Sequence, residues 1–113
     1  MIKIYHNPRC RKSREGLQIL QESGKDFEII EYLKESLSFD EVKAILNLLN
    51  IPPNKLLRKN EAVWKEHFKG KIMSDEDIIA SMVKFPKLIE RPIVINKEKA
   101  IIGRPPEAIK QIL

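Results

Sequence analysis

A strand pattern, a helix pattern and a second strand pattern follow one another within the first 33 residues. Residues 2–5 alternate apolar and polar side chains, which predicts a short strand that ends at Asn7-Pro8. A helix is expected over 11–22, and an apolar-rich second strand over 27–33. Two strands joined through a helix lie parallel with a right-handed crossover, so this segment predicts a βαβ unit.

The middle of the chain, from about residue 36 to residue 88, carries helix patterns. Ser38 and Glu41 form a capping box in front of apolar residues at helical spacing. Ser74 is followed by three carboxylates, which suit the start of another helix. Shorter helical pieces are expected over 55–57 and 61–68. We interpret the whole segment as a helical insertion.

The last third returns to strands. Residues 92–95 and 100–102 are separated by a polar turn over 96–99, which predicts a β-hairpin, and a final helix follows through 108–112. The order βαβ, helical segment, ββα predicts an α/β protein of the thioredoxin-like fold with a mixed four-stranded sheet. Residues 1–113 are expected to form a single domain of this type.

The composition places the chain among globular proteins, with 42% hydrophobic and 33% charged residues. It has no apolar run near the roughly 18 residues of a membrane span, and its start enters a strand pattern directly, so we expect no membrane segment and no signal peptide. One cysteine cannot form an internal disulfide, which indicates a reducing compartment. Cytoplasmic localisation is therefore expected.

The net charge of +5 favours anionic partners: nucleic acid, an acidic protein surface or a small oxyanion. Most charges are interspersed with charges of the opposite sign, a pattern that more often serves solubility than nucleic-acid binding. We therefore expect no direct contact with nucleic acid.

The single cysteine, Cys10, lies where the first loop enters the first helix. Free backbone N–H groups at a helix start stabilise an anion, and neighbouring cations lower a thiol pKa. A tight basic cluster surrounds this cysteine: Arg9, Arg11, Lys12 and Arg14. A lone cysteine is often only a small buried hydrophobe, but such a cysteine would not sit among four basic residues. Cys10 is thus predicted to be a nucleophilic thiolate, and the same N–H groups are predicted to hold a tetrahedral oxyanion against its sulfur.

Two polar residues flank this cysteine. His6 either fixes the turn or acts on the thiol, and these alternatives are equally open from the sequence. Ser13 is placed to donate a hydrogen bond to the sulfur or to the backbone. Neither histidine has a partner at metal-ligand spacing, so we predict no metal site.

Three arginines in the remainder of the chain are candidates for oxyanion binding. Pro92 stands at the start of a strand, where a cis Arg91-Pro92 bond would turn Arg91 toward the cysteine loop. Arg104 follows the hairpin, and Arg58 lies within the helical segment. Guanidinium groups that converge on a thiolate would clamp a phosphate-like anion, although each arginine taken alone is more often a surface residue.

These residues together resemble a known family, the glutaredoxin-dependent arsenate reductases (the ArsC family of the thioredoxin superfamily). The resemblance runs along essentially the full length of the chain. The matching segments are residues 5–10 with Ser13-Arg14, 56–60, 90–94 and 103–105.

The resemblance implies an activity. Cys10 would attack arsenate as a thiolate, glutathione would attack the adduct as co-substrate, and glutaredoxin would complete the reduction to arsenite. His6 would help to depress the cysteine pKa, and Arg58, Arg91 and Arg104 would bind the oxyanion. No bound cofactor is implied. We expect three further residues to support the site: Ser13, Arg11 and Pro92. The chain departs from the family at Arg11-Lys12, because well-studied arsenate reductases carry small uncharged residues directly after the cysteine.

The sequence is also compatible with two other functions. Spx-type regulators share the fold and bind the α subunit of RNA polymerase, but those that sense oxidants by a disulfide carry a second cysteine where this chain has Ser13. A glutaredoxin-like thiol oxidoreductase would use Cys10 on another substrate. A single-thiol enzyme needs an outside thiol in either redox case.

Overall fold

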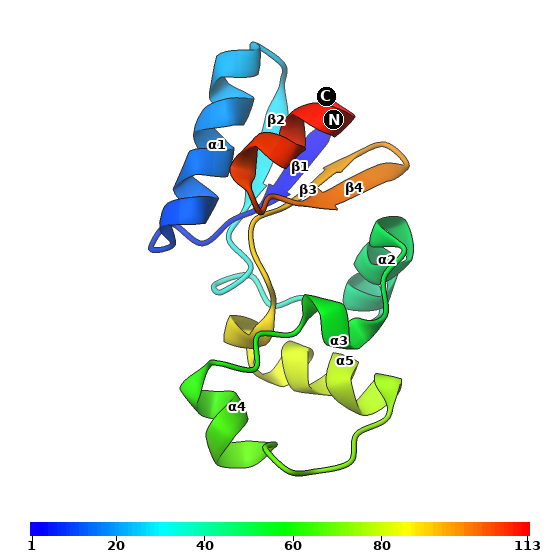
Figure 1. Cartoon of the computed structure of the whole chain (residues 1–113). Coiled ribbons are helices and arrows are strands. Elements are labelled where there is room, and N and C mark those ends of the chain that lie inside the picture. Colours follow the sequence, from blue (N-terminus) through cyan, green and yellow to red (C-terminus); the bar gives the residue numbers. More distant parts are fainter. The chain divides into compact units, whose positions relative to one another are not determined.

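The computed structural model describes residues 1–113, which divide into two compact units. Met1–Glu35 and Arg91–Leu113 form the sheet unit, and Ser36–Glu90 form the helical unit. Figure 1 shows the sheet with its two covering helices in the first unit and helices alone in the second.

The sheet has four strands in the order β2-β1-β3-β4. They are β1 (Ile2–Tyr5), β2 (Phe27–Ile30), β3 (Ile93–Asn96) and β4 (Lys99–Ile102). β1 and β2 are parallel, whereas β1–β3 and β3–β4 are antiparallel. The mixed four-stranded sheet and the βαβ start are both confirmed.

The two helices of the sheet unit, α1 (Arg11–Ser23) and η2 (Pro106–Ile112), pack against each other. A core cluster of buried apolar side chains joins them to the sheet: Ile2, Ile4, Leu20, Val94 and Ile109. Gly24 ends α1 in the left-handed conformation, with φ of 73°, which glycine adopts without a steric penalty. Burying each of these aliphatic side chains contributes about 1.5–3 kcal/mol.

Two glycines permit the closest packing in this unit. A Cβ atom on Gly16 of α1 would lie 2.9 Å from both Pro92 Cγ and Ile109 Cδ1. A Cβ atom on Gly103 would lie 2.8 Å from Pro92 Cγ. The buried Pro92 ring therefore fits only between residues without a side chain, one from α1 and one from the end of β4.

The helical unit contains four α-helices and one short 3₁₀-helix. They are α2 (Phe39–Leu49), α3 (Pro53–Leu56), α4 (Ala62–His67), α5 (Asp75–Lys84) and η1 (Pro86–Leu88). Ser38 with Glu41 forms the predicted capping box on α2, and Ser74 with Asp77 forms one on α5. α2 and α5 pack together through buried apolar faces.

Three elements differ from the sequence prediction. β2 ends at Ile30 rather than near Leu33, because the carbonyl of Glu31 accepts bonds from two following N–H groups and the chain turns there. The hairpin turn is tighter than expected, since Asn96 and Lys99 still pair as strand residues. The final helix is 3₁₀ rather than α, beginning with the bond from Ala108 N to Pro105 O.

No helix of the protein has both the length and the apolar content to cross a bilayer.

Candidate active site

The loop between β1 and α1 presents Cys10 at the N-cap position of α1. The residue has extended backbone angles, with φ of −96° and ψ of 124°, and its carbonyl accepts the first helical bond from Arg14 N at 3.0 Å. Its own N–H donates to Asn7 O at 3.0 Å, which closes the loop. The half-buried sulfur therefore lies at the end of α1 where unpaired N–H groups favour a negative charge.

A buried pair of side chains supports this loop from within. The His6 Nδ1 and Ser13 Oγ atoms are 2.7 Å apart, with His6 5% and Ser13 0% exposed. The backbone N–H of Asn7 donates to the same serine oxygen at 3.0 Å. The serine side chain thus bonds the loop backbone, but as an acceptor rather than as the donor that was expected.

Two of the three candidate arginines come together at the sulfur. Arg104 Nη2 lies 3.6 Å from Cys10 Sγ, and Arg104 Nε donates to Arg91 O at 2.9 Å. The Arg91 side chain also hydrogen-bonds to Cys10. The Arg91-Pro92 bond is cis, as the sequence suggested, and so is Arg104-Pro105, which the sequence analysis did not anticipate.

These contacts lower the pKa of Cys10 below its ordinary value of 9.0. Burial is the largest single cause and opposes the shift, because it disfavours the charged thiolate. The backbone N–H groups of Ser13 and Lys12, together with the hydrogen bond and charge of Arg91, outweigh it. A larger fraction of Cys10 is therefore thiolate, the reactive form, at any given pH than in a cysteine with the ordinary pKa.

The pKa of His6 is also lowered from its ordinary value of 6.5. Burial of the imidazole is the main cause, and the Arg14 charge acts in the same direction. The Glu31 carboxylate and the hydrogen bond to Ser13 oppose the shift without cancelling it. At neutral pH the ring is uncharged.

Arg58, the third candidate, belongs to the helical unit and is engaged by carboxylates there. Its Nη1 donates to Glu90 Oε1 at 2.6 Å and its Nε to Glu61 Oε2 at 3.4 Å. Burial tends to lower the pKa of Arg58, but these two carboxylates raise it overall. Backbone bonds from Arg58 N to Leu88 O and from Glu90 N to Leu56 O, both 2.8 Å, fix the pair. The sequence analysis missed this pairing, because its partners are 32 residues apart.

The supporting residues have different surroundings. The Arg11 side chain is 84% exposed and pairs with Glu15 at 3.0 Å on the outer face of α1, so the structure does not bring it to the sulfur. Arg14, which was noted only as part of the basic cluster, donates to Pro8 O at 3.0 Å and braces the loop. Pro92 is buried against Gly16 and Gly103.

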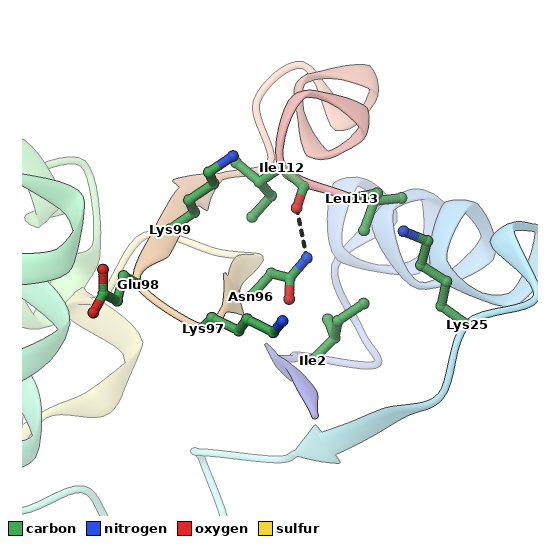
Figure 2. Close-up of a pocket in the computed structure, with 8 residues that line it drawn as sticks. All are labelled: Ile2, Lys25, Asn96, Lys97, Glu98, Lys99, Ile112 and Leu113. Atoms are coloured by element: carbon green, nitrogen blue, oxygen red, sulfur yellow. Dashed lines mark hydrogen bonds between the residues drawn. The ribbon is translucent and has the colours of Figure 1, made fainter.

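A hollow of about 650 Å³ lies at the opposite end of β1, beside Ile2 (Figure 2). Three lysines (Lys25, Lys97 and Lys99) and the apolar Ile112 and Leu113 help to line it, and Asn96 Nδ2 donates to Ile112 O at 2.7 Å across one side. None of the candidate site residues lines this hollow. The cysteine cluster is therefore separate from it.

Known proteins with similar sequences share nearly the whole chain. The uncharacterized protein YfgD of Escherichia coli is 42% identical over 99% of this chain and 96% of its own length. An arsenate reductase of Neisseria meningitidis is 38% identical over 99% of this chain and 97% of its own.

The fold comparison agrees. The structure of an arsenate reductase from Vibrio cholerae superposes with a TM-score of 0.95 at 41% identity, covering 99% of this chain and 97% of that one. The model of the ArsC family matches residues 5–112, which include the cysteine loop and all three candidate arginines. With sequence, fold and family model in agreement along its length, the chain belongs to the ArsC family.

Proposed function

We propose that this protein is a cytoplasmic arsenate reductase in which the thiolate of Cys10 is the nucleophile. The observation that carries the proposal is the cysteine at the N-cap of α1 with the side chains of Arg91 and Arg104 at its sulfur. A thiolate beside two guanidinium groups can hold a tetrahedral oxyanion in contact with the attacking atom. Two of the similar proteins are named arsenate reductases, so we propose arsenate as the oxyanion.

In the first step, the Cys10 thiolate attacks the arsenic atom of arsenate. A sulfur–arsenic bond forms, one arsenic–oxygen bond breaks, and the departing oxygen takes up protons and leaves as water. Arsenic remains pentavalent in this step. Arg91 and Arg104 neutralise charge on the oxyanion, which a negatively charged nucleophile would otherwise repel.

In the second step, arsenic is reduced by two electrons. The thiol of glutathione supplies the second sulfur, so that Cys10 and glutathione end as a mixed disulfide and arsenic leaves as trivalent arsenite. Glutaredoxin then reduces the mixed disulfide and restores the Cys10 thiol. The electrons come from two thiols, and the proposed chemistry uses no bound cofactor. The chain has one cysteine, so the second thiol must come from another molecule.

Arg58 is proposed as a third ligand of the oxyanion on the strength of the family motif. Its carboxylate partners, Glu90 and Glu61, would hold its guanidinium in one orientation. Two of its nitrogen atoms are used in these bonds, and the planar group carries further N–H donors.

The proposal is tested by arsenate-dependent oxidation of NADPH with glutathione, glutaredoxin and glutathione reductase present. We expect saturable turnover that is abolished in Cys10→Ser and unchanged in Lys110→Ala, a substitution on the exposed side of η2. Alkylation by iodoacetamide first establishes that Cys10 is reduced. Absence of turnover from protein with a reduced, alkylatable Cys10 would exclude arsenate as the substrate.

A further inference from the structure

The hydroxyl of Ser13 has two partners whose geometry restricts where its proton lies. The Asn7 backbone N–H can only donate, so Ser13 Oγ accepts that bond at 3.0 Å. His6 Nδ1 is the second partner, at 2.7 Å. The protonation state of Nδ1 then decides whether the serine donates to the ring or accepts from it.

A protonated Nδ1 would leave the serine proton without a partner. Ser13 Oγ would then accept from both the ring and Asn7, and its own O–H would need another acceptor in a site where Ser13 is 0% exposed. A buried donor without an acceptor costs about 1–3 kcal/mol. An unprotonated Nδ1 accepts the serine proton and satisfies all three groups at once.

Burial of the imidazole also disfavours the imidazolium. The Glu31 charge and the hydrogen bond to Ser13 favour the cation, and the Arg14 charge opposes it. Burial has the largest effect, so the pKa of His6 is lowered overall. Hydrogen-bond geometry and burial therefore point to the same neutral ring, protonated on Nε2.

We propose that His6 is a positioning residue that works as a neutral imidazole, accepting the Ser13 hydroxyl proton at Nδ1 and so fixing the loop that presents Cys10. The hydrogen bonds form a continuous path. Ser13 Oγ accepts a hydrogen bond from the N–H of Asn7, and the carbonyl of Asn7 accepts one from the N–H of Cys10. The inference rests on the proposed function only in taking Cys10 as the reacting group.

This arrangement specifies how His6 acts on Cys10, where the family resemblance implied only that it helps to depress the cysteine pKa. The Ser13 hydroxyl is committed to His6 and Asn7, whereas the Ser13 backbone N–H is one of the groups that lower the pKa of Cys10. The negative charge is balanced by backbone N–H groups and Arg91, without an ion pair to His6. His6 therefore affects the cysteine through geometry.

The first test is NMR of the folded protein labelled with ¹⁵N at histidine, with His67→Gln used to assign the His6 signals. We expect His6 Nδ1 to be unprotonated and Nε2 protonated throughout the pH range in which Cys10 becomes a thiolate. The same pattern is expected in Cys10→Ser. An imidazolium that loses its proton in step with the cysteine, or an Nδ1–H tautomer, would overturn the proposal whether or not arsenate is turned over.

The second test measures the rate of Cys10 alkylation against pH in variants. Ser13→Ala and His6→Ala should each slow alkylation at neutral pH by about tenfold, and the double variant should be little slower than either, because both remove one linked unit. His6→Asn can place an amide oxygen near the position of Nδ1, so it should retain more of the rate than His6→Gln. Multiplicative losses in the double variant, or equal losses in the Asn and Gln variants, would contradict a role through Ser13.

Discussion

At the scale of single residues, the chemistry of the site follows from where Cys10 lies. The sulfur is half-buried, which alone would favour the neutral thiol, yet the N–H groups of Ser13 and Lys12 and the Arg91 side chain lower its pKa. Arg104 reaches the same atom and is braced through the Arg91 carbonyl. Under the proposed function, the same few groups stabilise the thiolate and bind the oxyanion.

The first prediction concerns Arg104. Arg104→Ala should lower kcat/KM for arsenate by roughly 10- to 100-fold, because it removes a charge-assisted donor from the oxyanion. Arg104→Lys keeps the charge but loses the bond geometry of the guanidinium, so we expect an intermediate value. Steady-state kinetics with arsenate measure both, and Arg104→Ala kinetics equal to wild type would remove this residue from the site.

Arg11 gives a contrasting prediction for an arginine next to the cysteine in sequence. Its side chain is 84% exposed and pairs with Glu15, so solvent screens its charge. We expect Arg11→Ala to change kcat/KM for arsenate by less than about threefold. A loss as large as that of Arg104→Ala would show that Arg11 binds the oxyanion after all.

At the scale of elements, the position of the two arginines depends on packing between α1 and the end of the hairpin. Each arginine has a neighbour in the sequence that takes part in this packing: Pro92 follows Arg91, and Gly103 precedes Arg104. The N–H of Gly103 donates a hydrogen bond to the carbonyl of Pro92 at 2.8 Å, which joins the two segments. Both pack where Gly16 of α1 leaves room. The same helix begins at Cys10, so one packing contact sets the distance between the thiol and its cations.

A methyl group at residue 16 tests this packing. In Gly16→Ala the new Cβ would meet the rigid Pro92 ring at 2.9 Å, so the ring must move and carry Arg91 with it. We expect a loss of about 1–3 kcal/mol in the free energy of unfolding and a higher thiol pKa. Urea unfolding and the pH dependence of alkylation measure these effects. Gln18→Ala, on the exposed side of α1, is the control, and a Gly16→Ala protein that behaves like it would contradict the packing argument.

The Arg58 pair yields a prediction for the helical unit. Arg58→Ala leaves Glu90 and Glu61 without their cation at a partly buried position, where the Arg58 side chain is 13% exposed. We expect a loss of about 1–3 kcal/mol in the free energy of unfolding. Glu61→Gln, which removes only the longer bond, should cost less. Unchanged stability in Arg58→Ala would mean that the ion pair makes no net contribution.

Local sequence patterns predicted which segments form helices and which form strands. They predicted less well the residues at which these elements end. The capping box at Ser38 and the cap at Ser74 with its following carboxylates located the starts of α2 and α5, because these are interactions within four residues. The end of β2 and the 3₁₀ form of η2 depend on hydrogen bonds that no spacing pattern encodes. The approach of Arg104 to Cys10, 94 residues away, was implied by the family resemblance and not by any local pattern. The Arg58–Glu90 pair left no local signal.

At the scale of the whole molecule, the two lowered pKa values link stability to pH. Where the folded state has the lower pKa, the unfolded chain binds more protons and stability rises with pH. For His6 this stability is lost as pH falls below its unfolded value of 6.5. For Cys10 the stability continues to increase as the pH rises toward 9.0, the pKa of the thiol in the unfolded chain.

We therefore expect both groups to make the free energy of unfolding rise with pH, His6 over the range below pH 6.5 and Cys10 over the range below pH 9.0. Cys10→Ser should remove the part of the increase at alkaline pH, and His6→Asn the part at acid pH. Urea unfolding at a series of pH values measures both. An alkaline increase that persists in Cys10→Ser would assign it to other groups.

Reduction of arsenate through Cys10 can be followed in a single-turnover experiment. Reduced protein in excess over arsenate is mixed with glutathione and glutaredoxin, quenched at intervals, and assayed for arsenite. We expect all of the arsenate to become arsenite at a rate that rises with protein concentration, and Cys10→Ser to form none above the protein-free control. Equal arsenite formation by Cys10→Ser, or none by the fully reduced wild-type protein, would contradict reduction through Cys10.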